Sequence, residues 1–202
     1  TATGIGAHAS TPDVGNNALT GLLVFLGKLD FASCSQVDMV RKTASLFPHG
    51  DVNGKTLGVA MEDELSGNLT LSFNMLTVDA ASMDGEFDGR IPGCGNDENV
   101  LEVVRARMAE QGLTLLNKAL IPPHHVSADS YFVKTLLAAF ELYTGRKGEC
   151  QALGGGTYVH HLENGVAFGA AMPETDNKMH GPDEFAVVDE LLVSAKIFAQ
   201  AI

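Results

Sequence analysis

A histidine near the end of the chain lies in a setting suited to metal binding. His180 stands in the stretch Met179-His180-Gly181-Pro182-Asp183-Glu184, where Gly and Pro stiffen a turn. An imidazole binds a metal through one ring nitrogen while a carboxylate or a backbone group holds the other nitrogen. A zinc site needs about three or four protein ligands, and nothing else in the sequence obviously supplies them. We therefore expect this chain to be part of something larger.

Two other side chains are candidates for acting on a substrate. His8 lies between small residues just before Pro12, where its imidazole could donate a hydrogen bond to a developing oxyanion. The alternative is a surface histidine whose hydrogen bonds are satisfied locally. Arg90, in Asp88-Gly89-Arg90-Ile91-Pro92, ends an expected strand, and its planar guanidinium suits a carboxylate. The alternative for Arg90 is an ordinary salt bridge on an acidic chain.

A glycine-rich stretch, Gly154-Gly155-Gly156-Thr157, could offer backbone N–H groups to an anion. It lacks the Gly-x-x-x-x-Gly-Lys-Ser/Thr pattern of a nucleotide phosphate loop, and a plain flexible turn is the alternative. The pairs His124-His125 and His160-His161 are interpreted as structural, because neighbouring residues point in different directions on a strand or a helix.

Composition limits the classes of function. The net charge of −12 leaves no basic stripe for nucleic acid. No apolar run reaches the roughly 18 residues of a membrane helix, and no signal peptide is visible. Cys34, Cys94 and Cys150 are odd in number and widely spaced, which favours free thiols and a cytoplasmic location. The chain begins with Thr1 rather than Met, and we expect its natural start upstream.

The elements that must position these residues change in character along the chain. Hydrophobic periodicity predicts helices near 16–29, from Ser35 to Pro48, and over 96–111. Strands are expected at 57–61, 69–75, 80–91 and 113–120, the second because apolar and polar residues alternate. This order predicts an open, mainly antiparallel α+β sheet backed by helices.

The stretch Ile121 to Val126 contains Pro122-Pro123 and is the predicted domain boundary. Beyond it we expect an apolar helix over 129–143, a strand over 165–170 and a final helix over 185–202. This alternation of helix and short apolar strand suggests the edge of an α/β sheet.

Taken together, these segments resemble the dinuclear zinc aminoacylase/dipeptidase family of metallopeptidases. Gly6 to Pro12 and Gly15 to Ala18 resemble its lid motif. Three later stretches resemble the C-terminal catalytic segment of the family: Gly154 to Thr157, Asn164 to Gly169 and Met179 to Glu184. The subgroup that the chain most resembles is that of the PepV-type Xaa-His dipeptidases, relatives of carnosinases. The likeness covers nearly the whole chain in the right order and spacing.

The resemblance implies a role for each matching residue. His180 would be a zinc ligand, and His8 the lid histidine that stabilises the tetrahedral intermediate. Arg90 would grip the terminal carboxylate of a dipeptide, although Gly89-Arg90-Ile91-Pro92 lacks the family's aromatic residue after the arginine. The glycine-rich stretch 154–157 would line the same pocket. In the family two zinc ions, with manganese as an alternative, share the hydroxide that attacks the peptide carbonyl, and a glutamate moves the proton.

The remaining zinc ligands and the Glu-Glu pair with the general base are expected upstream, and this sequence contains no Glu-Glu pair. The resemblance thus implies most of a lid domain over 1–121 and the C-terminal segment of an α/β zinc-peptidase catalytic domain over 122–202. Such a chain should be inactive without its partner, the rest of its own catalytic domain. Two alternatives stay open: a non-catalytic binding or regulatory module of the same fold, and an aminoacylase or carboxypeptidase with the same metal site.

Overall fold

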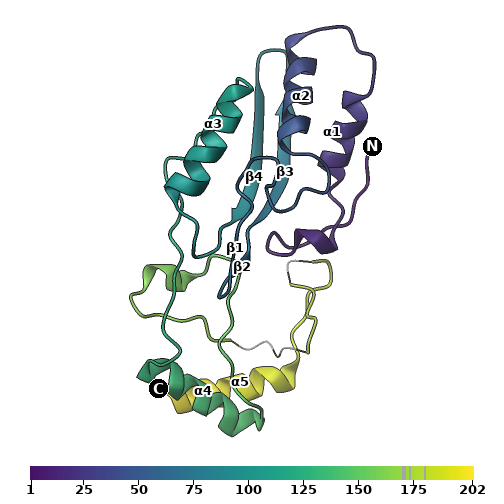
Figure 1. Cartoon of the computed structure of the whole chain (residues 1–202). Helices are drawn as coiled ribbons and strands as arrows, with labels where there is room; N and C mark the ends of the chain where they lie inside the picture. Colours follow the sequence, from purple (N-terminus) through teal and green to yellow (C-terminus); the bar gives the residue numbers. More distant parts are fainter. Residues whose placement is uncertain (170–171, 173, 180) are drawn as a thin grey trace. The chain divides into compact units, whose positions relative to one another are not determined.

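The computed structural model describes residues 1–169, 172, 174–179 and 181–202 (Figure 1), so His180 lies outside the described residues. The chain divides into two compact units. Unit 1 comprises residues 1–123 and 153–155, and unit 2 comprises residues 124–152 and 156–202. That residues 1–121 are a lid and residues 122–202 part of a catalytic domain stays a prediction.

Unit 1 is built on an antiparallel hairpin of β3 (Thr70–Val78) and β4 (Met83–Arg90). The two-residue strands β1 (Glu62–Asp63) and β2 (Gly67–Asn68) form a second, short hairpin. Leu71 and Phe73 are buried on one face of β3 while Thr70 and Ser72 are not, as the alternation in the sequence predicted. Mixed helices and antiparallel strands make the fold α+β.

Helices and loops bury one face of this hairpin. Unit 1 contains α1 (Ala18–Gly27), α2 (Ser35–Leu46) and α3 (Glu102–Glu110), the last preceded by a π-helical turn at Asp97–Leu101. Figure 1 shows these helices beside β3 and β4. Leucine, valine and phenylalanine side chains from all of them form one core: Leu23, Leu46, Phe47, Leu57, Val59, Leu69, Leu71, Phe73, Val100 and Val104. The rings of Phe47 and Phe73 stack with centroids 4.6 Å apart.

Asparagine side chains begin two of the helices and hold one of them on the sheet. Asn17 Oδ1 accepts the N–H groups of Leu19 and Thr20 at the start of α1, while its Nδ2 donates to Phe73 O of β3. Asn96 caps the turn that leads into α3, and the two acidic residues after it suit a helix N-terminus. The Asn17 side chain thus caps the start of a helix and satisfies an edge carbonyl of the sheet.

Two expected strands of unit 1 are wrong. Leu57 and Val59 are apolar because they are buried in the core, but Gly54 and Gly58 have positive φ and turn the chain there. The segment 113–120 is not a strand either. Its ends bond elsewhere, Leu113 N–H to Met108 O and Leu120 N–H to the Asp97 carboxylate, so it forms no ladder.

The described part of unit 2 is helical. It contains α4 (Tyr131–Thr144), a short 3-10 turn at Tyr158–His161 and α5 (Val188–Ala201). Ser130 caps the start of α4, and Gly145 ends it in the left-handed conformation. The strand expected over 165–170 is wrong for its described residues 165–169, where Gly165 O bonds to the His124 ring instead of a neighbouring strand.

In the described part of the chain, no helix is both long and apolar enough to cross a membrane.

Candidate functional site

The ring of His8 is fixed by the turn in which it stands. Thr11 N–H donates to His8 O across a tight turn. The Ser10 hydroxyl lies 2.7 Å from His8 Nδ1, and Ser10 N–H donates to the same nitrogen at 3.2 Å. A backbone N–H can only donate, so Nδ1 must present its lone pair. The proton of the neutral ring therefore sits on Nε2, so that Nε2 is the ring nitrogen that can donate.

Arg90 ends β4, and its guanidinium is held by a residue of the same strand. Arg90 Nε donates to Asp88 Oδ1 at 2.6 Å, and Nη2 donates to Oδ2 at 2.9 Å. Residues two apart on a strand lie on one face, which makes this two-pronged ion pair possible. Both side chains are about one-third exposed. The ion pair uses the Nε and Nη2 atoms of the guanidinium, and Nη1 takes no part in it.

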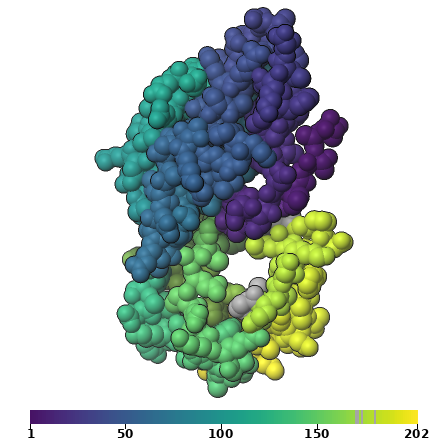
Figure 2. All heavy atoms as spheres, turned by 45° about the vertical axis from the view of Figure 1, so that its right-hand side comes forward, coloured from purple at the N-terminus to yellow at the C-terminus, as the bar shows by residue number. Residues whose placement is uncertain are grey.

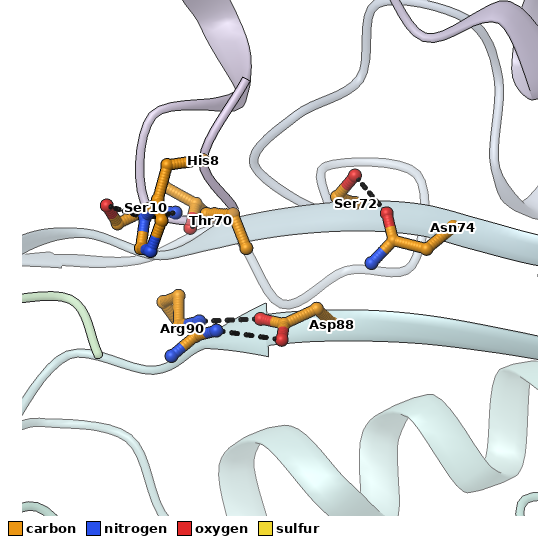
Figure 3. Close-up of polar contacts among 8 residues, drawn as sticks. His8, Ser10, Thr70, Ser72, Asn74, Asp88 and Arg90 are labelled. Carbon is orange, nitrogen blue, oxygen red and sulfur yellow. Dashed lines mark hydrogen bonds and ion pairs between the residues drawn. The ribbon is translucent and has the colours of Figure 1, made fainter. Parts of the chain in front are cut away.

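The His8 turn and Arg90 are linked through the sheet. Thr70 of β3 pairs directly with Arg90 of β4, and the Thr70 hydroxyl donates to Ala9 O at 2.9 Å. Cross-strand partners present their side chains on the same face. Figure 3 shows His8 and Ser10 beside Thr70, with the Arg90–Asp88 pair on the neighbouring strand. The turn that orients His8 is thereby attached next to Arg90.

This face of the hairpin, opposite the core, carries only polar side chains near its Arg90 end. Ser72 pairs with Asp88 across the two strands. The Ser72 hydroxyl donates a hydrogen bond to Asn74 Oδ1 at 2.6 Å. Asn74 stands at an irregularity in the strand register between Phe73 and Met75. We call Thr70, Ser72, Asn74, Asp88 and Arg90 the polar face; Figure 3 shows all five.

Part of the glycine-rich stretch belongs to unit 1 and lies against the same residues. A Cβ added to Gly154 would come 2.7 Å from Ser10 Cβ, whereas one added to Gly155 would lie 3.8 Å from Arg90 Nη1. A glycine at 154 is therefore what lets the backbone approach Ser10 so closely. His8, Arg90 and Gly154-Gly155, far apart in sequence, are brought together in unit 1.

The other predicted residues are not part of this group. Gly156 and Thr157 belong to unit 2, where Thr157 caps the 3-10 turn and its N–H donates to His160 Nδ1. His180 lies outside the described residues. The residues described contain no cluster of three or more His, Cys, Asp or Glu that could hold a metal ion. The described residues alone therefore do not fit a zinc centre.

His49-Gly50-Asp51 has a His-x-Asp spacing, but the structure gives both side chains other partners. His49 Nδ1 lies 2.9 Å from the Thr20 hydroxyl. Burial raises the pKa of Asp51, yet hydrogen bonds from Thr56, Lys55 and Asn53 outweigh that effect and leave the pKa below its usual value. These bonds close the loop after α2, so the pair is structural.

The paired histidines also have structural contacts. His124 Nε2 lies 2.6 Å from Gly165 O, and its ring is 5.6 Å from that of His160. One histidine of each adjacent pair thus meets the other pair, a proximity that the sequence did not predict.

Comparison with known proteins relates the chain to dipeptidases. It is 34% identical over 200 residues to the Beta-Ala-Xaa dipeptidase of Lactobacillus delbrueckii subsp. lactis, a match that covers 98% of this chain and 42% of that protein. It is 37% identical over 204 residues to the Bacillus subtilis protein named "Putative dipeptidase YtjP", again 98% of this chain and 42% of the relative. A Staphylococcus epidermidis protein named "Putative dipeptidase" is 28% identical over 201 residues, with the same coverage.

The chain therefore spans about 42% of the length of these curated relatives. No protein-family model matches it.

Proposed function

We propose that this chain is the C-terminal part of a zinc-dependent, PepV-type dipeptidase of the dinuclear aminoacylase/dipeptidase family. The carrying observation is the grouping of His8, Gly154-Gly155 and Arg90 around one end of the polar face of unit 1. The similarity to proteins named dipeptidases over 98% of this chain supports the same proposal. The enzyme would act in the cytoplasm on dipeptides with a free C-terminal carboxylate.

Each member of the group has a task in this proposal. Arg90 binds the terminal carboxylate through the guanidinium edge that Asp88 leaves outside the ion pair. Gly154 and Gly155 contribute backbone groups to the same pocket. His8 donates from Nε2 to the oxyanion that forms when the peptide carbonyl is attacked. A pocket that requires a carboxylate one residue after the scissile bond favours dipeptides over longer peptides.

The metal centre requires residues beyond this chain. We propose that His180 supplies one ligand to a pair of zinc ions, or of manganese ions, and that the other ligands and the general base belong to the rest of the catalytic domain. Without that partner the chain is inactive. The described residues do not supply a metal cluster of their own.

Unit 2 offers a surface for that partner. Several large apolar side chains of α4 and α5 stay exposed, among them Tyr131 (88%), Leu142 (67%), Val188 (68%) and Leu192 (57%). Figure 2 shows atoms of both helices, in green and yellow, at the surface. Monomeric soluble proteins rarely leave a large contiguous apolar patch in water. The exposure of these side chains in this chain therefore supports a partner that covers them.

The test is made on a longer protein that contains this chain. It should hydrolyse Xaa-His or β-alanyl dipeptides, lose activity with a chelator and recover it with zinc or manganese. His180→Ala should lower the bound metal measured by elemental analysis, since it removes a ligand. Absence of hydrolysis in the metal-loaded protein would reject the enzyme.

Two other functions remain to be separated by the same assays. A non-catalytic binding module would bind dipeptides through the same residues without cleaving them. An aminoacylase or carboxypeptidase would use the same carboxylate grip but prefer N-acyl amino acids or longer peptides.

A further inference from the structure

Ser10 contacts His8, the side chain proposed to stabilise the oxyanion. Its position determines which nitrogen of the His8 ring carries the proton. Its hydroxyl and its backbone N–H both approach His8 Nδ1, at 2.7 and 3.2 Å. The backbone N–H cannot accept, so the hydroxyl also donates to the Nδ1 lone pair. Two donors on one nitrogen favour the tautomer that has its proton on Nε2.

We propose that Ser10 is a positioning residue that holds His8 in the Nε2–H tautomer, in the orientation that the proposed dipeptidase function requires. A ring with its proton on Nδ1 would point it at the Ser10 N–H and would leave Nε2 without a hydrogen to donate. An oxyanion is stabilised only by donors placed in advance where its charge develops. The tautomer therefore decides whether His8 can perform its proposed task.

Two neighbours keep Ser10 in place. The Cβ of Ser10 packs against Gly154, where an added Cβ would come 2.7 Å away. The backbone carbonyl of the preceding residue, Ala9, accepts a hydrogen bond from the hydroxyl of Thr70 on β3. Gly154 and the sheet thus hold Ser10 in place, and Ser10 in turn orients the His8 ring. All of these residues belong to unit 1.

The test is the tautomer of His8 in the chain of 202 residues, measured from the ring-nitrogen shifts in long-range ¹H–¹⁵N spectra and assigned with His8→Gln. Ser10→Ala removes the hydroxyl but keeps the Cβ and the backbone N–H. Ser72→Ala is the matched control, since it removes a hydroxyl of the polar face that bonds Asn74 instead. Amide spectra establish that each variant is folded.

The wild type should show a pyridine-type Nδ1 and a pyrrole-type Nε2. Loss of one neutral hydrogen bond in Ser10→Ala should shift the tautomer ratio roughly five-fold toward Nδ1–H, and Ser72→Ala should not change it. A wild-type ring protonated on Nδ1, or a ratio unaffected by Ser10→Ala, would overturn the proposal.

In the longer protein, Ser10→Ala should lower kcat about five-fold with little change in KM, because the hydrogen bond acts in the transition state. A longer protein without dipeptidase activity would reject the proposed function, while the tautomer measurement would still decide the role of Ser10.

Discussion

Replacing Gly154 with alanine should displace the turn that holds His8. The new Cβ would lie 2.7 Å from Ser10 Cβ, whereas carbon atoms in contact rest about 3.5–4.0 Å apart, so one segment must move by about 1 Å. Overpacking costs about 1–3 kcal/mol, and we expect the lower end because a loop can yield. In the longer protein, a shift of about 1 Å at a reacting group can cost on the order of 100-fold in kcat/KM.

Gly156→Ala provides the matched comparison, because a Cβ there meets no atom within 4 Å. Neither glycine has a positive φ, so both variants lose similar freedom in the unfolded chain, and the difference between them isolates the collision with Ser10. Amide spectra of the chain should show His8 and Ser10 shifted by Gly154→Ala and unaffected by Gly156→Ala. Urea unfolding followed by the same amides gives the free-energy difference. Equal effects of the two substitutions would refute the packing of Gly154 against Ser10.

Three further outcomes are expected. Asp88→Asn should weaken the interaction with Arg90 by about 1 kcal/mol or less, since the pair is partly exposed. The substitution should also shift the Arg90 Nε–H resonance, and an unchanged resonance would mean that the pair is absent in solution. Leu69→Ala, at a fully buried site, should cost about 2–5 kcal/mol of unfolding free energy, against less than about 0.5 kcal/mol for the exposed Leu65→Ala. The Ser66 hydroxyl and N–H lower the pKa of Asp63 to about 2; this stabilisation is present above the usual pKa of an aspartate and is lost as the pH falls through about 2. A carboxyl-carbon NMR titration checks the value and should show it raised by Ser66→Ala.

The helices and the main hairpin were predictable because local signals determine them. Alternation of apolar and polar residues predicted the buried face of β3, and hydrophobic periodicity predicted the helices that Asn96 and Gly145 are found to cap. The residues 57–61 were misassigned as a strand because burial alone makes them apolar, and glycines of positive φ bend the backbone there. A short apolar run indicates burial and does not identify the element.

The candidate site was predictable residue by residue but not as an arrangement. The resemblance named His8 and Arg90, yet only the pairing of Thr70 with Arg90 and the bond from Thr70 to Ala9 bring them together. The bond from Thr70 to Ala9 joins segments 61 positions apart, and spacing in the sequence carries no information about it. The ion-pair partner of Arg90 could have been predicted from the sequence. Asp88 stands two positions before Arg90 on the same strand, so the two side chains must lie on the same face.

The most direct test of the account is whether Arg90 recognises the terminal carboxylate. A longer protein containing this chain is assayed with a dipeptide and with the corresponding dipeptide amide, which lacks that carboxylate, before and after Arg90→Ala. The wild type should strongly prefer the dipeptide. Arg90→Ala should remove most of this preference by lowering kcat/KM for the dipeptide alone. A preference that survives the substitution would reject Arg90 as the residue that binds the carboxylate, and the proposed dipeptidase function with it.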